Sequence, residues 1–438
     1  MPGLTARPRR CYVVCTEVPP GVVGGLGRYA ERMIPALRDV GVPVEVFGAV
    51  GPHRRARTER TGDVTLHRPA GTERNGDVTL HRLRTSGQTV SAPGTGRRPR
   101  MPRAVRPLVR IAGLLAFNVR VAARILRGGA RSGAVVAVHD WMGCLAGILC
   151  RLLGRMPVVF HVHTCEHVAA PGARRSAVAA GIAALETAQA RLASLIVVPS
   201  AGMRDELVAR GWPPGRLRVV PHGFEDPELV RLAGLSGADR DRLRSEIRAR
   251  YLPGGAGRLV VYAGRLSPHK GVHTLIRAVP AMLRERDDLR IVLIGGQTPG
   301  TGDNAEVARL IEREGVGGHV VAGYRFVDPP EVFAHFLAAD VCAFPSSYEP
   351  FGLVAVEAMA LGRPVVVGAG YSPEVVGDGA IRCRTDSPAE LAAALSRCLD
   401  HPQDAARLAR RGAEHVRARY SWARTAEATL AAYAEVAR

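Results

Sequence analysis

The sequence predicts an α/β protein with two Rossmann-like domains, each built on a doubly wound parallel sheet. Segments rich in Val, Ile and Leu alternate with helical segments, which is typical of parallel strands covered on both faces. The alternation runs twice and is interrupted by a polar stretch rich in proline and glycine at 225–257. At 438 residues, two or three domains are also expected from length alone. We therefore expect a first domain at 1–224, a linker at 225–257, a second domain at 258–418, and a C-terminal helix at 419–438 that packs back toward the first domain.

The first domain opens with the apolar strand CYVVCTEV, followed by a glycine-rich turn that contains Gly24 and Gly25, and then a helix that ends near Val40. A turn of this kind before a helix can bring backbone N–H groups to a phosphate. The spacing is GGxG and not the dinucleotide fingerprint GxGxxG. A phosphate site and a tight strand-to-helix connection both remain open.

An irregular segment rich in arginine, glycine and proline follows at 51–107 and contains a duplication. TERTGDVTLHR at 58–68 returns as TERNGDVTLHR at 72–82. Two copies are too few for a solenoid, which needs at least about three units. The pattern predicts an inserted hairpin, with disorder as the alternative.

The next segment, AVRPLVRIAGLLAFNVRVAARILR at 104–127, is a basic amphipathic helix. A helix with this pattern either packs its apolar face on the sheet or lies on anionic lipid. The strand AVVAVHD follows immediately. This order favours a helix that packs on the sheet.

Charge, cysteine content and the lengths of apolar runs limit the partners, metal sites and cellular location that the sequence predicts. Sixty basic against 40 acidic residues give a net charge of +20, which favours acidic partners such as nucleotide phosphates or anionic lipid. The eight cysteines show neither Cys-x-x-Cys nor zinc-site spacing. The chain has no signal-peptide pattern and no run of about twenty apolar residues. We expect a cytoplasmic protein, with peripheral contact with the anionic inner face of the membrane left open.

The second domain carries two unusual stretches after strands. GRLSPHKG at 264–271 contains Arg265 and Lys270, and Lys270 is the only lysine in a chain with 59 arginines. An ammonium is a compact point charge that guanidinium does not replace. The two cations, Arg265 and Lys270, together suit a diphosphate. In PSSYEPFGLVAVEAMALGRP, at 345–364, Glu349 precedes a helix N-terminus that can hold an anion. A core helix with incidental glutamates is the alternative. Ligands of doubly wound sheets bind at the carboxyl ends of strands, so we expect a site in a cleft between the domains.

These two stretches, together with GGLGRY near the N-terminus and VVPHG before the linker, resemble the family 4 glycosyltransferases, which are retaining enzymes of the GT-B fold. The resemblance covers nearly the whole chain outside 51–107. It implies two Rossmann-like domains that face each other across a cleft. It also implies a nucleotide-sugar donor, with a UDP-sugar favoured, and an acceptor hydroxyl on a small molecule, an oligosaccharide or a lipid-linked carrier. Neither a cofactor nor a metal is expected.

The resemblance assigns roles to individual residues. Arg265 and Lys270 would neutralise the leaving diphosphate, Glu349 would hold the donor sugar, and Glu357 would bind the ribose. His139, in the HDW sequence of the first domain, completes the catalytic set by contacting the donor sugar. The expected donor-binding residues are Gly24, Gly25, Gly323, Tyr324, Arg325, Phe351, Gly352, Leu353 and Glu357, and the acceptor side is expected at Arg28 and His163.

Other functions remain as alternatives. A glycogen-, trehalose- or sucrose-type synthase or a sugar phosphorylase would use the same fold, although Val22 departs from the Lys-x-Gly-Gly loop of bacterial glycogen synthases and disfavours a long polymer. A non-catalytic basic protein that binds membranes or nucleic acid is a third reading. Intact Arg265, Lys270 and Glu349 argue against it, and no nucleic-acid partner is expected.

Overall fold

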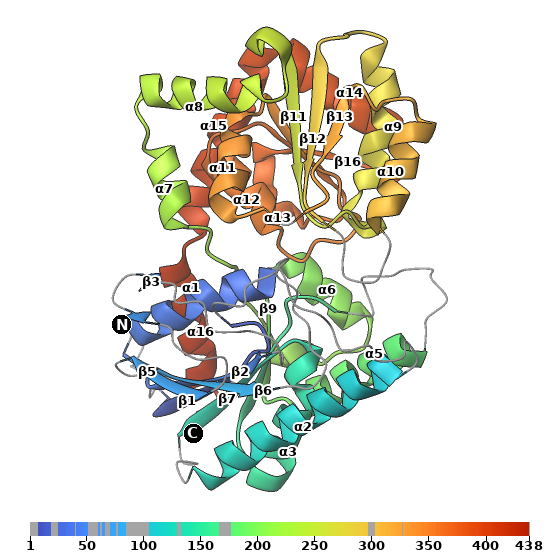
Figure 1. The fold of residues 1–438 in the computed structure, drawn as a ribbon. Coiled ribbons are helices and arrows are strands. Elements are labelled where there is room, and N and C mark those ends of the chain that lie inside the picture. Colours follow the sequence, from blue (N-terminus) through green and yellow to red (C-terminus); the bar gives the residue numbers. More distant parts are fainter. Residues whose placement is uncertain are drawn as a thin grey trace. The chain divides into compact units, whose positions relative to one another are not determined.

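The structure is a computed structural model of the 438-residue chain. It describes residues 8–18, 25–39, 41–50, 60–61, 64–65, 71–75, 78–84, 105–128, 133–165, 177–296, 303–325 and 327–437. The chain divides into two compact units, each with its own sheet (Figure 1). The first unit comprises Met1–Pro221 and Trp422–Arg438, and the second comprises His222–Ser421.

The sheet of the first unit has eight strands in the order β10-β9-β8-β7-β1-β2-β6-β5. All neighbouring pairs are parallel except β5 and β6. The strands are β1 (Arg10–Val14), β2 (Val44–Val50), β5 (Gly71–Asn75), β6 (Val78–Arg84), β7 (Ala134–His139), β8 (Val158–His161), β9 (Leu195–Val198) and β10 (Leu217–Val219). Every residue of β7 is buried, as expected for a central parallel strand that is covered on both faces.

Helices cover both faces of this sheet (Figure 1). On one face lie α1 (Gly25–Asp39) and the C-terminal helix α16 (Trp422–Ala434), which contact each other. On the other lie α2 (Val105–Arg127), α3 (Cys144–Gly154) and α5 (Ala177–Leu192), and α6 (Ala201–Ala209) packs beside β9 and β10. The basic helix α2 packs on the unit through Phe117, Val121 and Ile125, which are buried.

The duplicated sequence forms the same antiparallel pairing twice. In the second copy, Arg74 pairs with Thr79 and Asn75 with Val78. In the first copy, β3 (Arg60–Thr61) and β4 (Val64–Thr65) pair the residues fourteen positions earlier in the same register. The predicted hairpin is therefore confirmed in the described parts of both copies.

Only the second copy extends the large sheet. Its strand β6 pairs in parallel with β2, whereas β3 and β4 form a separate two-stranded sheet. His81 of β6 is buried, stacks on Phe47 with ring centroids 4.9 Å apart, and lies 2.7 Å from the Glu45 carboxylate. These contacts hold the hairpin on the edge of the sheet.

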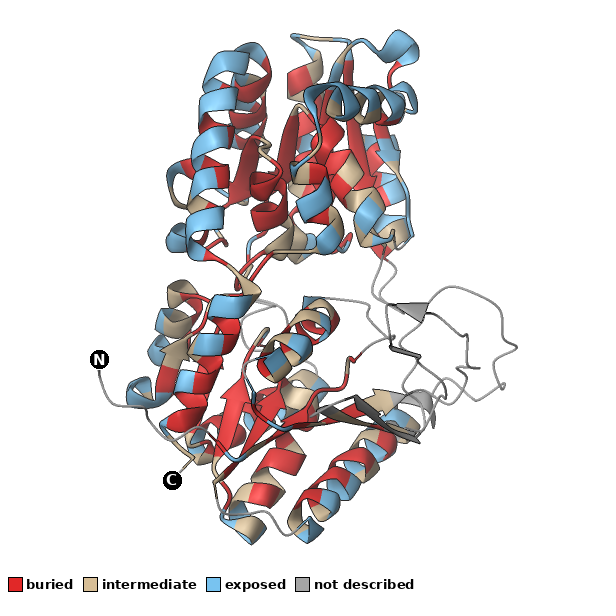
Figure 2. Ribbon diagram, turned by 90° about the vertical axis from the view of Figure 1, so that its left-hand side faces the viewer, coloured by how far each residue is buried: buried red, intermediate tan, exposed pale blue. Residues whose placement is uncertain are grey.

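The second unit has a six-stranded parallel sheet in the order β13-β12-β11-β14-β15-β16. Its strands are β11 (Arg258–Ala263), β12 (Leu289–Ile294), β13 (Val320–Ala322), β14 (Val341–Phe344), β15 (Val365–Gly368) and β16 (Ile381–Cys383). Because side chains alternate along a strand, Leu259 and Val261 enter one core cluster while Val260 and Tyr262 enter the other. Figure 2 shows this burial in the strands and on the inner sides of the helices.

Nine α-helices surround this sheet among the described residues, and three of them, α7, α13 and α14, were not expected from the sequence. They are α7 (Pro227–Ala233), α8 (Gly237–Ala249), α9 (Val272–Leu283), α10 (Asp303–Arg313), α11 (Pro329–Ala338), α12 (Leu353–Ala360), α13 (Pro373–Val376), α14 (Pro388–Asp400) and α15 (Pro402–Arg419). Helix α14 starts at Pro388 after Ser387, whose hydroxyl accepts the Glu390 N–H, an arrangement typical of a helix N-terminus.

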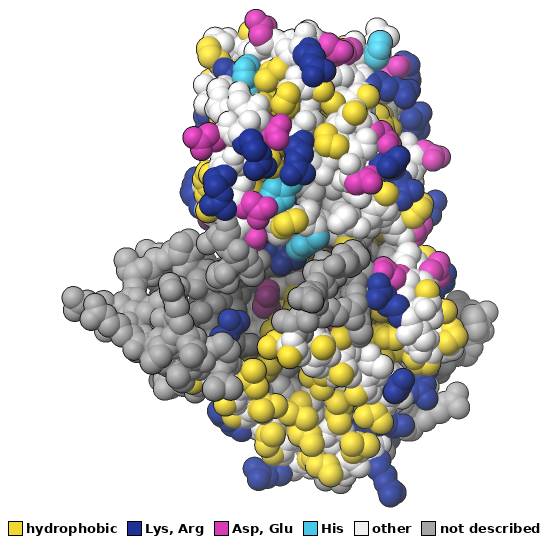
Figure 3. Space-filling model, turned by 90° about the vertical axis from the view of Figure 1, so that its right-hand side faces the viewer, with side chains coloured by type: hydrophobic (Ala, Val, Ile, Leu, Met, Phe, Trp, Pro, Cys, Tyr) yellow, Lys and Arg dark blue, Asp and Glu magenta, His cyan; other side chains and the backbone are white. Residues whose placement is uncertain are grey.

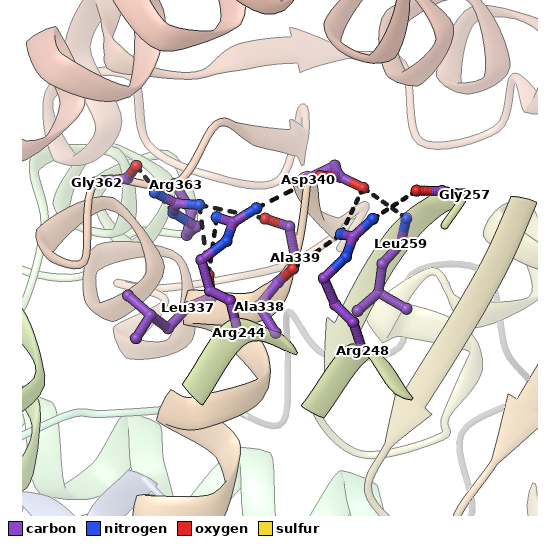
Figure 4. A network of polar contacts seen from close by, with 10 residues as sticks. All are labelled: Arg244, Arg248, Gly257, Leu259, Leu337, Ala338, Ala339, Asp340, Gly362 and Arg363. Carbon is purple, nitrogen blue, oxygen red and sulfur yellow. Dashed lines mark hydrogen bonds and ion pairs between the residues drawn. The ribbon is translucent and has the colours of Figure 1, made fainter. Parts of the chain in front are cut away.

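Residues 225–257 form α7 and α8, which pack on α11 within the second unit. Figure 4 shows Arg244 and Arg248 of α8, with Arg363, pointing toward Asp340 and the carbonyls at the end of α11. Arg248 donates to Asp340 Oδ2 at 2.9 Å, and the Leu259 N–H donates to the same oxygen at 2.8 Å. One carboxylate therefore joins α8 to the start of the central strand.

Candidate active site

The strand order of the second unit brings two distant loops together. Strand β11 lies between β12 and β14, so the chain runs outward in opposite directions from this point. The loops that follow the neighbouring strands β11 and β14 therefore begin side by side at the carboxyl edge, where doubly wound sheets bind ligands. Lys270 lies in the first loop and Glu349 in the second, and Lys270 Nζ donates to Glu349 Oε2 at 2.7 Å.

Close backbone contacts fix the two loops to each other. Gly271 has φ of 74°, and a Cβ at this position would overlap the carbonyl oxygen of Pro345. The Ser347 N–H donates to the His269 carbonyl at 2.9 Å. A side chain at 271 would separate the loops, so the glycine that follows Lys270 is required for the contact between Lys270 and Glu349.

The ion pair is largely shielded from water. The side chains of Lys270 and Glu349 are 18% and 12% exposed, and Ser346 Oγ donates to the same carboxylate oxygen at 3.4 Å. The Glu349 backbone N–H donates to the Gly370 carbonyl. Both charges are thus held in position before any ligand binds.

Arg265 is exposed and is oriented by a residue that sequence reasoning missed. Its Nη2 lies 3.3 Å from His269 Nε2, and its carbonyl accepts the Tyr262 hydroxyl at 2.7 Å. Burial, with the nearby Arg265 and Lys270 charges, lowers the pKa of His269 to about 4. The neutral imidazole can therefore accept a hydrogen bond from the guanidinium. The position of His269 between the two cations in GRLSPHKG is the signal that could have identified it.

Gly352 shapes the turn into α12. Its φ is 82°, and a Cβ there would overlap the Tyr371 ring and crowd Glu349. Leu353 is the first residue of α12, and Phe351 is buried against Tyr420 with ring centroids 5.2 Å apart. The backbone amides predicted to approach the donor thus lie at the N-terminus of α12, where the turn into the helix requires glycine at 352.

Glu357 lies on α12 and is 1% exposed. Gly323, Tyr324 and Arg325 follow β13, and Arg325 forms an isolated bridge with Gly295 after β12. Tyr324 has φ of 47° and is 37% exposed. These residues lie at the same carboxyl edge of the sheet as the Lys270–Glu349 pair, and their roles toward the ribose and the base stay predictions.

In the first unit, the structure joins His139 to two other histidines. The register of β7 and β8 sets His139 opposite His161, and their rings stack at 4.4 Å. His139 Nδ1 lies 2.9 Å from His163 Nε2. Burial lowers the pKa of His163 to about 3 and holds the pKa of His161 well below its usual range. The two rings are therefore neutral at physiological pH.

Two further residues that sequence reasoning did not place support this histidine cluster. Tyr433 of the C-terminal helix α16 shares a hydrogen bond with His161 Nε2 at 2.8 Å. Asp140, with φ of 53°, accepts the His163 N–H at 2.7 Å, and burial raises the pKa of its carboxyl to about 7. The spacing of His161 and His163, two positions apart at the end of one strand, was the sequence signal that could have identified this cluster.

Two further predicted residues of the first unit, Gly25 and Arg28, lie in the first turn of α1. Gly24 lies outside the described residues, and Gly25 is the exposed first residue of α1. Arg28 is half-buried on the same helix, whose Tyr29 packs against His163 with ring centroids 4.4 Å apart. Arg28 therefore comes one residue before the tyrosine that contacts His163.

Sequence comparison identifies the family. A model described as Glycosyltransferase Family 4 matches residues 23–226, and one described as Glycosyl transferases group 1 matches residues 244–415. The D-inositol 3-phosphate glycosyltransferase of Corynebacterium efficiens is 31% identical over 338 residues, covering 74% of this chain and 76% of that protein. The chain belongs to glycosyltransferase family 4.

This glycosyltransferase is also similar to the glycogen synthase of Mycobacterium tuberculosis, with 27% identity over 442 aligned residues, 97% of this chain and 94% of that protein. Among solved structures, sucrose-phosphate synthase of Thermosynechococcus elongatus has a TM-score of 0.68 at 24% identity and covers 96% of each chain. Anabaena HepE, solved in complex with UDP-glucose, has a TM-score of 0.68 at 19% identity and covers 96% of this chain and 98% of that chain. The two doubly wound units are those of the GT-B fold, as predicted.

Proposed function

We propose that this glycosyltransferase moves a sugar from a nucleotide-sugar donor to an acceptor hydroxyl with retention of anomeric configuration. The observation that carries the proposal is the shielded Lys270–Glu349 pair at the carboxyl edge of the second sheet. Lys270 and Arg265, whose charges both act on His269, supply two cations for a diphosphate, and Glu349 supplies a carboxylate for sugar hydroxyls. A UDP-sugar is favoured as donor because HepE, a protein of the same fold, was solved with UDP-glucose.

The chemistry follows from where charge develops. As the bond between the anomeric carbon and the diphosphate oxygen breaks, negative charge grows on the leaving group. Fixed cations near that oxygen stabilise the transition state more than the ground state. The acceptor oxygen bonds to the anomeric carbon on the face that the diphosphate leaves, and its proton moves to the departing phosphate oxygen. Arg265 and Lys270 fill the charge-neutralising role in this proposal.

Two parts of the donor have separate proposed contacts. Glu349 binds a hydroxyl of the transferred sugar, and Glu357 binds the ribose. The backbone amides of Phe351, Gly352 and Leu353 approach the sugar and phosphate, and Tyr324 lies toward the base. The acceptor is a hydroxyl of a small molecule, an oligosaccharide or a lipid-linked carrier.

The test is a panel of UDP-, GDP-, ADP- and TDP-sugars, read by thermal shift and by nucleotide release. A ligand that binds the native state alone raises apparent stability, so the correct donor should raise Tm and release its nucleotide. Product stereochemistry by NMR tests retention, and unchanged turnover in EDTA is expected for a reaction without metal. Glu349→Gln should abolish turnover while the protein stays folded. Absence of binding and release with every donor would refute the proposal.

A polymer synthase is the second candidate, because the similarity to glycogen synthase extends over 97% of the chain. Glycogen and maltooligosaccharides as acceptors would distinguish it: growth of the glucan favours the synthase, and transfer only to small acceptors favours the main proposal. Release of sugar phosphate that depends on added inorganic phosphate would instead indicate a phosphorylase.

A further inference from the structure

Three neighbouring helices of the first unit expose large apolar side chains. Of the ten large hydrophobic residues that the described parts of the chain expose, six lie on α2, α3 and α5. We call their outer faces the α2–α3–α5 surface. The six residues are Ile111, Leu115, Val119, Leu152, Leu153 and Val178, with 47% to 69% of each exposed. A soluble monomer rarely gathers such side chains on one face without a partner for them.

The apolar residues of α2 form a stripe beside α3. Ile111, Leu115 and Val119 recur every four residues, so they line one side of the helix. Asn118, near this stripe around the helix, donates to the Met142 carbonyl and accepts the Ala146 N–H at the start of α3. Helix α3 in turn contacts α5. At the other end of α3, Leu126 of α2 packs against Gly154, so the helices that carry the stripe and the exposed leucines lie side by side.

The charge of this surface has one sign. Arg120, Arg124 and Arg127 follow the other edge of the exposed side of α2, and Arg155 follows α3. Within the described ranges 105–128, 133–165 and 177–194, the only acidic residues are Asp140 and Glu186, and both are buried. Figure 3 shows hydrophobic side chains gathered over this face, with Lys and Arg side chains at its margin and no Asp or Glu among them.

We propose that the α2–α3–α5 surface docks peripherally on an anionic phospholipid bilayer. Apolar side chains that enter the interface and arginines that meet lipid phosphates are the two contributions that bind a protein to such a membrane. A nucleic acid would use the arginines but not the exposed leucines. None of the helices in the described part of the chain is long and apolar enough to span the bilayer. The inference does not rest on the proposed donor chemistry.

The experiment is co-sedimentation of the full chain with vesicles of phosphatidylcholine, either alone or with about 30% phosphatidylglycerol. We expect binding to the anionic vesicles, little binding to the neutral ones, and loss of binding near 0.5 M salt, where the screening length is about 4 Å. Vesicle binding is read without donor or acceptor. A failure of the donor assignment therefore leaves this result unaffected.

Two variants of the surface have matched controls on the second unit. Ile111→Gln with Leu115→Gln and Val119→Gln should weaken binding at least about tenfold, whereas Val230→Gln, at a side chain exposed to a similar extent (54%), should not. Arg127→Glu with Arg155→Glu should weaken binding at least about thirtyfold, since each arginine near an anionic surface strengthens it about fivefold. The control for this pair is Arg410→Glu with Arg411→Glu, which are exposed on α15.

Circular dichroism identifies a variant that fails to fold, and the charge-reversal pair, which removes no apolar contact, then carries the test. Several outcomes would overturn the proposal: no binding to anionic vesicles, equal binding to neutral vesicles, or equal losses in the controls. Light scattering that shows a dimer in the wild type and a monomer in the glutamine variant would also overturn it, because the surface would then join two copies of the chain.

Discussion

Replacement of Lys270 tests the candidate site most directly. Its Nζ lies 2.7 Å from Glu349 Oε2, and both side chains are mostly shielded, with 18% and 12% exposed. Removing one partner of a fully buried pair costs about 3–5 kcal/mol, and the residual exposure here reduces this to about 2 kcal/mol. Loss of one fixed charge at a developing anion lowers kcat by about 10²–10³-fold. We expect both effects in Lys270→Ala.

Nucleotide release measures kcat, and urea unfolding measures stability. Lys270→Ala combined with Glu349→Gln should recover most of the lost stability, because no unpaired carboxylate remains, but none of the turnover. Lys270→Arg should also lose most activity, since the planar guanidinium does not occupy the place of an ammonium beside the tight Gly271–Pro345 contact. Arg277→Ala, at an exposed cation on α9, is the control and should be near neutral. A Lys270→Ala enzyme with near-normal kcat would refute the assignment.

Three further predictions concern stability and are measured by urea unfolding. Gly352→Ala should cost about 2–4 kcal/mol and abolish donor binding, because the added methyl overlaps the Tyr371 ring and the residue is strained at positive φ. The control Gly362→Ala, with φ of 68° and open space around it, should cost only about 1 kcal/mol. Equal losses in the two variants would show that the contact with Tyr371 does not require glycine at 352. The native pKa of His163 lies near 3, below the unfolded value of about 6.5, so its contribution to the free energy of unfolding is complete above pH 6.5 and falls by up to about 1.4 kcal/mol per pH unit below it. His163→Asn should therefore lose less stability than the wild type between pH 7.5 and 5.5. Identical pH slopes would show that His163 takes up a proton in the folded protein. Asp340→Asn should cost about 2–4 kcal/mol by leaving Arg248 without its carboxylate partner. The control Asp404→Asn, at an exposed pair with Arg407, should change stability little. Comparable losses in both variants would show that Asp340 does not stabilise the packing of α8 more than a surface ion pair does.

The strands and most helices were predictable because hydrophobic periodicity is local. The runs at 134–138 and 365–367 are continuously apolar, and they lie in the buried strands β7 and β15. The hairpin of the duplicated sequence was predictable because each copy carries a GDVTLHR segment that reads as a turn followed by a strand. Helices α7 and α13, of seven and four residues, are too short to show a helical period, and α14 was not predicted although Ser387 and Pro388 mark its start.

By itself, the sequence determined the two alternations of strand and helix, and hence two doubly wound sheets, and it marked Lys270 as the exceptional cation. Only the tertiary structure decided that Lys270 pairs with Glu349, 79 positions away, that Tyr433 reaches His161, and which copy of the duplication extends the sheet. The physical reason is that these contacts depend on strand order and register. Both arise from packing between distant segments, and periodicity along the chain does not encode them.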